Sequence, residues 1–384
     1  MRHENSLFHA LTKHIPWAVF ERLVAEHKAD HGVRRLDSRS QLVALLFGQF
    51  SGASSLREIE AGLTSHQARL YHLGASRPAR STLADANAKR PCALFADLFA
   101  HMASQANRST RRQIADATRI IDATKVKLSD LSADWARFSD AHCAAKLHIV
   151  YDPHGAMPLK AEITPDTVND ITPAKALKIE PGATYVFDLA YYDFGWWAEL
   201  NGQGCRFVSR LKGNTRITET QQRALPQGSD ILSDRIGFLP RRLAYARQNP
   251  MHEAVREITV RISTGKIIAL VTNDLDAKPE DIADLYKQRW QIELFFKWIK
   301  QNLKIKHFLG TSENAVRIQL FTALIAFLVL RAAQAAQSAI TQPLKFVRLV
   351  RLNLMHKRSI DNLIQPEIPP PIDIRQIALD FAKC

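Results

Sequence analysis

The 384-residue sequence predicts an α/β fold, a mixed core with an inserted β-rich region that lies between two helical regions. Three observations predict this order. Apolar residues recur at helical spacing up to about residue 92, period-two alternation begins at Arg119, and helical spacing returns after Pro279. Strands and helices that alternate along the middle of a chain are typical of a sheet covered by helices.

The first region, residues 1–92, is expected to hold several short helices. In Ser54-Ser55-Leu56-Arg57-Glu58 a serine precedes the glutamate by three residues, which is a helix-start pattern. Another short helix is expected after a cap at Ser81 or Thr82, with basic residues around it. A helix N-terminus flanked by Arg and Lys can contact phosphate. An ordinary helical bundle with a solvated basic face explains the same residues equally well. Residues 93–118 are expected to form a helical connector.

Residues 119–211 are expected to form the first part of the core. The first strand alternates from Ile120 to Leu128 and carries Asp122 on its apolar face. Two further strand-like runs flank the turn Asp152-Pro153-His154-Gly155, which predicts a β-hairpin. A short apolar strand then ends at Asp188, and a helix and another strand are expected after it.

Residues 212–265 are polar and rich in strand-forming residues, which predicts the β-rich insertion. Residues 266–306 are expected to complete the core with a buried strand and a helix of about 24 residues that begins near Pro279 and ends near Leu303. Residues 307–384 are expected to form a helical C-terminal region. Its segment 313–340 is either a plain core helix or part of a dimer interface.

The composition favours a polyanionic partner. Lys and Arg number 52 against 38 Asp and Glu, which gives a net charge of +14 and a pI near 9.7. An excess of this size favours nucleic acid, and it makes residues 1–92 a candidate DNA-binding domain. A basic protein without such a partner is the alternative that charge alone leaves open.

Cysteines and hydropathy indicate a soluble intracellular protein. The four cysteines are scattered with no C-x-x-C pair, which fits neither a disulfide framework nor a zinc site. The N-terminus mixes charged and polar residues with apolar ones, so no signal peptide is expected. The longest apolar stretch, Ile318 to Leu330, is too short to span a membrane and predicts a core helix.

Four polar side chains of the helix expected after Pro279 lie on one side of it. Tyr286, Arg289, Glu293 and Lys300 fall within about 60° of one another in a helical projection. They border a stripe that is expected to be buried and consists of Leu285, Ile292, Phe296, Ile299 and Leu303. Arg289 and Glu293 also have the spacing of an ordinary surface salt bridge, so the helix alone does not predict a site.

Two aspartates on strands strengthen the case. Aspartate is depleted in strands, and a buried carboxylate is costly unless it is paired, hydrogen-bonded or bound to a cation. If the fold brings Asp122, Asp188 and Glu293 together, three hard oxygen ligands make a Mg²⁺ site. Two such ions could activate an attacking oxygen and stabilise a leaving one at phosphorus. Each aspartate alone is more often a cap or a turn residue.

These residues together resemble the DDE transposases of bacterial insertion sequences, in particular the IS-four family. The signature of that family is Y-x2-R-x3-E-x6-K, and it stands here as Tyr286, Arg289, Glu293 and Lys300. Asp122 in Ile-Ile-Asp-Ala-Thr and Asp188 in Val-Phe-Asp-Leu-Ala are similar to the two aspartates of the family. The resemblance covers roughly residues 50 to 310.

The resemblance implies an RNase H-like catalytic core with the β-rich insertion between the second aspartate and the glutamate. It implies cut-and-paste transposition through a hairpin intermediate, with Asp122, Asp188 and Glu293 as catalytic ligands of two Mg²⁺ ions, which Mn²⁺ may replace. Tyr286, Arg289 and Lys300 would then hold DNA phosphates around a flipped base, and Trp290 would help to displace that base.

The same resemblance implies the partners and the location of the protein. The expected partners are double-stranded DNA, both as the terminal inverted repeats of the element and as the target, and a second copy of the chain in a homodimer. No membrane partner is expected. The expected location is the bacterial cytoplasm, in association with the nucleoid.

The sequence departs from the family pattern at two places. Many relatives carry Arg-Gly after the second aspartate, where this chain has Leu189-Ala190. Some relatives stack the flipped base on a tryptophan of the insertion, and no tryptophan occurs here between Trp197 and Trp290. The aromatic residues that could replace it are Phe207, Phe238 and Tyr245. Two alternatives remain at this point, namely an inactive DNA-binding descendant of a transposase and another RNase H-like nuclease.

Overall fold

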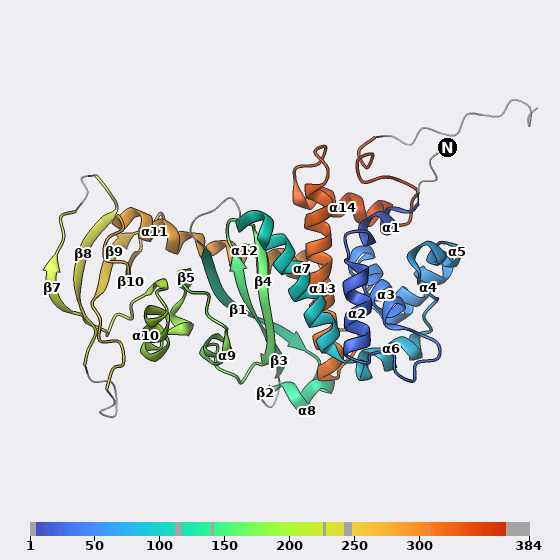
Figure 1. Ribbon diagram of the computed structural model, residues 1–384, viewed down its shortest axis with the longest axis horizontal. Helices are drawn as coiled ribbons and strands as arrows, with labels where there is room; N and C mark the ends of the chain where they lie inside the picture. Colours follow the sequence, from blue (N-terminus) through green and yellow to red (C-terminus); the bar gives the residue numbers. More distant parts are fainter. Residues whose placement is uncertain are drawn as a thin grey trace, which may run out of the picture.

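The computed structural model describes residues 5–111, 117–139, 142–225, 228–241, 248–305 and 307–365. Its strands form a single mixed sheet that runs from the middle of the molecule to one end, and helices from both ends of the chain gather at the other end (Figure 1). The helical regions before and after the mixed part of the sequence therefore form one region in space, and the mixed part forms the other.

The N-terminal helices are short, as predicted, except for the last. They are α1 (Leu7–Thr12), α2 (Trp17–Glu26), α3 (Ser38–Ser51), α4 (Leu56–Ser65), α5 (Gln67–Leu70), the 3₁₀ turn η1 (Tyr71–Leu73), α6 (Arg80–Lys89) and α7 (Cys92–Arg111). The predicted start of α4 is confirmed, because the Ser55 side chain accepts from the backbone N–H of Glu58. The predicted cap of α6 is wrong. That helix begins at Arg80, after Ala79, and has no side-chain cap.

Two helices of the C-terminal region complete the helical body. The long apolar helix α13 (Glu313–Ala335) packs against α7, α3 and α6, and α14 (Pro343–Asn353) follows it. By length and composition α13 could cross a membrane, yet 83% of its most apolar window is buried inside the protein. It is thus the core helix that the sequence predicts. The backbone N–H groups of Leu7 and Phe8 bond to the carbonyls of His356 and Leu354 just after α14, so α1 is joined to the end of α14.

Five strands build the core of the sheet, in the order β4-β3-β1-β5-β6. These strands are β1 (Thr118–Leu128), β3 (His142–Asp152), β4 (Met157–Pro165), β5 (Thr184–Phe187) and β6 (Arg206–Arg210). The predicted hairpin is confirmed as β3 and β4, which are antiparallel, and β3 is antiparallel to β1. β1, β5 and β6 are parallel. This arrangement agrees with an RNase H-like core, and the short β2 (Arg137–Ser139) pairs with the far end of β3.

The strands of the insertion extend the same sheet. They are β7 (Thr218–Gln222), β8 (Ile231–Phe238) and β9 (Val255–Arg261), and β10 (Ile267–Thr272) joins them to β6. All pairs from β6 outward through β10, β9 and β8 to β7 are antiparallel. The insertion therefore lies at the end of the sheet far from the helical body (Figure 1).

A buried ion pair ties the insertion together, and it allows a prediction about stability. Arg256 on β9 is 0% exposed and donates from Nε and Nη2 to the two carboxylate oxygens of Asp234 on β8, at 2.7 Å each. Removing one partner of a buried pair leaves an unpaired buried charge. We expect Asp234→Ala to lower the free energy of unfolding by about 3–5 kcal/mol, as measured by urea denaturation. The control Glu219→Ala, at a half-exposed pair with Arg235, should cost no more than about 1 kcal/mol. Equal losses in the two variants would contradict this assignment.

Helices cover both faces of the sheet. They are the turn η2 (Asp130–Ser132), α8 (Ala133–Ala136), α9 (Ile171–Ala176), the turn η3 (Leu189–Tyr191), α10 (Phe194–Gly202), α11 (Pro279–Gln288) and α12 (Trp290–Asn302). The two faces belong to separate apolar clusters. Ile120 packs in the cluster that includes α12 and α13, whereas Ile121 packs in the cluster that includes α10. The alternation of β1 therefore buries one face under each cluster.

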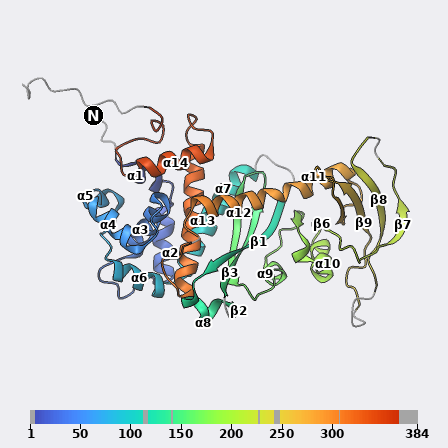
Figure 2. The ribbon, with the colours of Figure 1, turned by 180° about the vertical axis from the view of Figure 1, so that it is seen from behind.

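The helix predicted from Pro279 to Leu303 is in fact two helices joined end to end. Figure 2 shows α11 and α12 as one rod that leads from the insertion to the helical body. They meet at Arg289, where the N–H of Arg289 bonds to the carbonyl of Tyr286 and the N–H of Ile292 to the carbonyl of Arg289. These bonds span three residues instead of four, so the backbone tightens by a local 3₁₀ turn. The four side chains singled out in the sequence lie on both sides of this turn.

Candidate active site

Pairing in the sheet brings the two aspartates side by side. β1 and β5 are parallel neighbours, and Ile121 of β1 is opposite Phe187 of β5. Asp122 and Asp188 are the next residues along each strand, so they sit at the same level of the sheet. Glu293 lies in the first turn of α12, which packs across β1. Asp122 is thus a neighbour of Asp188 in the sheet and lies on the strand across which the helix of Glu293 packs.

Arg289 joins two of the three carboxylates. Its Nη2 atom donates to Oε1 of Glu293 at 2.6 Å, and its Nη1 atom lies 3.6 Å from Oδ2 of Asp122. All three side chains are at least partly buried, with 14% of Arg289, 34% of Glu293 and 17% of Asp122 exposed. The i,i+4 pair is therefore more than a surface salt bridge, because it extends to the strand. The guanidinium sits among carboxylates, whereas the sequence resemblance implied a phosphate as its partner.

The electrostatic environment of Asp122 is unusual. Its pKa is raised to about 7, above all by burial. A backbone bond from Ala123 opposes the rise, the charge of Asp188 adds to it, and Arg289 and Glu293 act in opposite directions. Asp122 therefore responds to both other carboxylates, which identifies the three as one electrostatic cluster. A raised carboxyl pKa in a cleft is typical of a functional site.

The donor chemistry of the cluster fits a hard divalent cation. Carboxylate oxygens are the ligands that Mg²⁺ and Mn²⁺ prefer, and a cation would favour the charged form of Asp122, which burial disfavours. Within the part of the chain that the structure describes, no three Asp, Glu, His or Cys side chains are close enough to hold a metal ion. Arg289 lies between Asp122 and Glu293 and supplies the positive charge there.

Lys300 connects α12 to β1 at a second point. Its Nζ atom donates to Oγ1 of Thr124 at 2.6 Å. Thr124 follows Asp122 by two residues on the same face of β1, and Lys300 follows Glu293 by two helical turns. A cleft of about 410 Å³ lies between these points, and it is lined by Asp122, Ala123, Thr124, Glu293, Phe296, Lys297, Lys300 and Gln301. Among the lining residues of α12, Phe296 belongs to the stripe that the sequence predicts to be buried, whereas the sequence did not single out Lys297 and Gln301. The four- and eight-residue offsets of the last two from Glu293 would have placed them on the same helix face.

The contact between Lys300 and Thr124 gives a second prediction. If the cleft carries out the DNA strand cleavage that the sequence resemblance implies, Thr124→Val should slow that cleavage by roughly tenfold, because it removes an acceptor for a charged donor worth about 1.5–3 kcal/mol. Duplex binding should stay within about twofold, since the charge of Lys300 remains. Thr124→Ser keeps the hydroxyl and should restore the rate, as followed by gel assay. A valine variant as fast as wild type would show that Thr124 does not position Lys300.

Tyr286 and Trp290 flank the cluster without lining the cleft. The guanidinium carbon of Arg289 lies 5.6 Å from the centre of the Tyr286 ring, and burial raises the pKa of the Tyr286 phenol. Trp290 is 58% exposed and points into solvent from the start of α12. Tyr286 therefore supports Arg289, and Trp290 remains free to contact a bound molecule.

The turn after Asp188 does not need the glycine found in many relatives. The Asp188 side chain accepts from the backbone N–H of Ala190 at 2.8 Å and caps the turn η3. Among the described non-glycine residues only Lys28 and Ala156 have positive φ, so Ala190 is unstrained. The departure at Leu189-Ala190 thus leaves the position of Asp188 intact.

Among the three aromatic residues proposed to replace the missing tryptophan, one is excluded. Phe207 is 0% exposed and packs against Phe187 and Trp197, so it cannot stack on a base. Phe238 on β8 is 41% exposed. Tyr245 lies outside the described residues.

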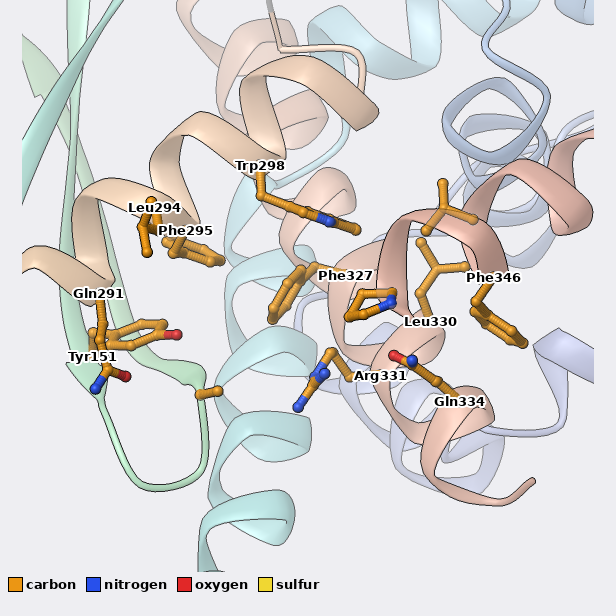
Figure 3. Close-up of a pocket in the computed structure, with 13 residues that line it drawn as sticks. Tyr151, Gln291, Leu294, Phe295, Trp298, Phe327, Leu330, Arg331, Gln334 and Phe346 are labelled. Atoms are coloured by element: carbon orange, nitrogen blue, oxygen red, sulfur yellow. The ribbon is translucent and has the colours of Figure 1, made fainter. Parts of the chain in front are cut away.

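A second hollow, of about 230 Å³, lies elsewhere on α12 (Figure 3). Figure 3 shows Leu294, Phe295 and Trp298 of α12 facing Phe327 and Leu330 of α13 and Phe346 of α14. No carboxylate lines this hollow. Tyr151, at its edge, has a pKa raised to about 12 by burial, so its phenol stays protonated at neutral pH. The hollow therefore lacks groups for phosphoryl transfer, and the cleft beside Asp122 is the candidate active site.

Comparisons with known proteins match the chain to a protein family. Residues 115–329 match a family model described as a transposase DDE domain, and residues 3–76 match a domain of unknown function (DUF4372). The chain is 40% identical over 301 residues to the protein of Sinorhizobium fredii named as the transposase y4zB, a match that spans 77% of this chain and 82% of that protein.

A protein of Geobacillus stearothermophilus named as a transposase for insertion sequence element IS5377 is 31% identical over 261 residues, which is 65% of this chain and 66% of that protein. Among solved structures, a cryo-EM structure of the piggyBac transposase synaptic complex with hairpin DNA aligns with a TM-score of 0.46 at 11% identity. That alignment covers 100% of this chain and 86% of the other.

Proposed function

Because this chain belongs to the family of transposases with a DDE domain, we propose that it moves its own insertion sequence by a cut-and-paste reaction. In this reaction the protein cleaves DNA at the ends of the element, passes through a hairpin intermediate, and joins the 3′-hydroxyl ends to target DNA. Within the family we assign it to the IS-four group on the spacing from Tyr286 to Lys300.

The observation that supports the proposal most strongly is the grouping of Asp122, Arg289 and Glu293 beside a lysine-lined cleft, with Asp188 on the neighbouring strand. Asp122 and Asp188 lie at the same level of parallel strands, and Arg289 links Glu293 to Asp122. Lys297 and Lys300 line the cleft next to them. Oxygen ligands for cations beside cationic contacts for phosphate are the combination that phosphoryl transfer requires.

Asp122, Asp188 and Glu293 would hold two Mg²⁺ ions, or Mn²⁺ in their place. When bound, such ions activate the attacking oxygen and stabilise the leaving oxygen at phosphorus. Asp122 must lose its proton to serve as a ligand, and its raised pKa means that it holds that proton up to about pH 7 in the metal-free protein. In the metal-free protein Arg289 pairs with Glu293 and lies beside Asp122.

The remaining residues would bind DNA. Lys300, held by Thr124, points a cation at the cleft where the scissile phosphate would lie. Arg289, once it leaves the carboxylates, and Tyr286 are within reach of the next phosphates. Trp290 is exposed and can displace a base from the stack. The partners are then the terminal inverted repeats, the target duplex and a second copy of the chain. The reaction takes place in the bacterial cytoplasm at the nucleoid.

The experiment that tests the proposal uses the DNA that borders the gene. The purified protein is incubated with a duplex that carries the inverted repeat and flanking sequence, with Mg²⁺ or with EDTA, and a circular target plasmid is added. We expect nicked and hairpin ends with Mg²⁺ alone and joined products in the plasmid. Binding without cleavage would indicate an inactive DNA-binding descendant, and cleavage without joining would indicate a nuclease. Both of these results contradict the proposal.

A further inference from the structure

The positive charge of the chain is concentrated in one part of the sequence. Between Leu294 and Ile360 there are eleven Lys and Arg residues and a single acidic residue, Glu313. This segment carries a net charge of +10, out of +14 for the whole chain. Residues 1–92, where the sequence predicts the DNA-binding domain, carry thirteen Lys and Arg and eight Asp and Glu. The strongest polyanion-binding potential therefore lies outside that region.

The fold gathers part of this charge into a continuous surface. The end of α12 is held by α14, because Nη2 of Arg351 donates to the carbonyl of Asn302 at 3.0 Å. It is also held by α3, because the backbone N–H of Lys304 donates to Oε1 of Gln49 at 2.7 Å. Arg351 additionally packs on Gly52, where α3 ends. The cleft, the end of α12 and α14 are thus consecutive parts of one surface.

The cations along this path face outward. Lys297 on α12 is exposed and Lys304, just after the end of α12, is half-buried. On α14, Lys345, Arg348 and Arg351 are exposed, while Phe346 and Val350 face the core. The helix α14 contains no acidic residue. Close to Lys304 lies Glu58, whose pKa is lowered by hydrogen bonds from Ser54 and, to a lesser degree, by Lys304. We call Lys297, Lys304, Lys345, Arg348 and Arg351 the basic ridge.

The length of the ridge suits a nucleic-acid backbone. From Glu293 to Asn302 the helix rises by about 14 Å, at 1.5 Å per residue. That is roughly four base pairs of a duplex that rises 3.4 Å per base pair. A duplex with its scissile phosphate beside Glu293 would therefore reach α14 within about half a helical turn. Cations at this spacing neutralise successive phosphates and release their counterions.

We propose that the basic ridge is the main surface on which this protein binds duplex DNA without regard to sequence, and that it aligns the duplex with the cleft. The inference rests on the proposed function for the identity of the polyanion. It gives the C-terminal helix α14 a DNA-binding role, whereas the sequence suggested a dimer interface in the region 307–384. Phosphate contacts fix the register of a duplex and carry no sequence information, so residues 1–92 remain available to recognise the ends.

The test compares two triple variants of the full chain with equal loss of charge. The ridge variant is Lys345→Gln, Arg348→Gln and Arg351→Gln. The control is Arg261→Gln, Lys266→Gln and Lys278→Gln, three exposed positions on and beside the insertion. Binding to an end duplex and to a scrambled duplex is measured by fluorescence anisotropy in EDTA. The salt concentration runs from roughly 50 to 300 mM, which covers the steep part of the salt dependence. Circular dichroism and sedimentation report folding and oligomeric state.

For the ridge variant we expect weaker binding to both duplexes by the same factor, with a salt-dependence slope lower than that of wild type by about 2.7, or 0.9 for each lost phosphate contact. The control should keep the wild-type slope. An unchanged slope in a folded ridge variant overturns the inference. Two other results also overturn it. One is a change of oligomeric state in sedimentation without a change in DNA binding, which would make α14 a protein interface. The other is tighter binding of wild type to anionic vesicles than to either duplex. Cleavage by wild type in Mg²⁺ tests the proposed function separately, because binding here is measured without metal.

Discussion

Replacement of Glu293 by glutamine is expected to slow DNA strand cleavage by roughly a thousandfold. A lost ligand removes several kcal/mol of transition-state stabilisation, and each 1.4 kcal/mol changes a rate tenfold. Glutamine keeps the shape of the side chain, so packing around α12 should be unaffected. Duplex binding without metal should be equal or tighter, since a negative charge beside the cleft is removed. The measurement is single-turnover cleavage with excess protein in Mg²⁺ and in Mn²⁺.

The matched control for this prediction is Asp284→Asn. Asp284 lies on the exposed side of α11, so the variant has the same change of charge at a position that does not face the cleft. Its rate should stay within about twofold of wild type, as is usual for surface substitutions. Calorimetry should show weaker binding of Mn²⁺ to the Glu293→Gln protein and unchanged binding to the control. If the glutamine variant cleaves as fast as Asp284→Asn, Glu293 is not a ligand.

Local patterns carried most of the information about this site. The alternation of β1 placed Asp122 on an apolar face, and helical spacing placed Glu293 and Lys300 on one side of a helix, as the structure bears out. Both depend on the backbone period alone. Asp122 and Asp188 lie at the same level of the sheet because β1 and β5 pair in a parallel register. No spacing in the sequence specifies that register.

The differences between prediction and structure arise where non-local contacts decide. Arg289 was expected to hold phosphate, and in the structure it bonds to Glu293 and approaches Asp122, because β1 brings a second carboxylate beside the helix. The tight turn at Arg289 divides the expected helix, and no proline or glycine lies there from which the turn could be predicted. Phe207 was considered for base stacking because it is aromatic, yet it lies on a central strand beneath α10, where Phe187 and Trp197 pack against it.

Local patterns also could not predict that the N-terminal helices pack against the helices of the C-terminal region. Apolar periodicity predicts that α13 buries its surface, and it does not say against which helices. In the structure, α13 packs against α7, α3 and α6 of the N-terminal region. The same packing carries the end of α12 to α3 and α14, and so creates the basic ridge beside the cleft.

Replacement of Asp122 by asparagine is expected to abolish cleavage and at the same time to stabilise the metal-free protein at pH 8. The pKa of Asp122 is raised from 3.8 to about 7 in the folded state. Between these values the folded protein holds a proton that the unfolded chain has lost, so stability falls as pH rises from about 4 to about 7 and stays low above it. The cost of keeping Asp122 charged is on the order of 4 kcal/mol at pH 8.

Asparagine cannot ionise, so it removes this cost and keeps the size of the side chain. We expect Asp122→Asn to raise the free energy of unfolding in EDTA by up to about 4 kcal/mol at pH 8 and by much less at pH 5, where wild type is also neutral at this position. Urea denaturation at the two pH values gives both numbers. The control Asp284→Asn should show no such dependence on pH.

Divalent ions should make wild type more stable than the Asp122→Asn variant. A ligand that binds only the folded protein stabilises it by mass action, so Mn²⁺ at saturating concentration should stabilise wild type at pH 8 and have little effect on the asparagine variant. Wild type then regains with metal what Asp122 costs without it. A site arranged in this way is less stable when empty, because the fold buries the Asp122 carboxylate near two other carboxylates. If Asp122→Asn destabilises the metal-free protein at pH 8, Asp122 is a structural carboxylate paired with Arg289 and the metal-site assignment is wrong.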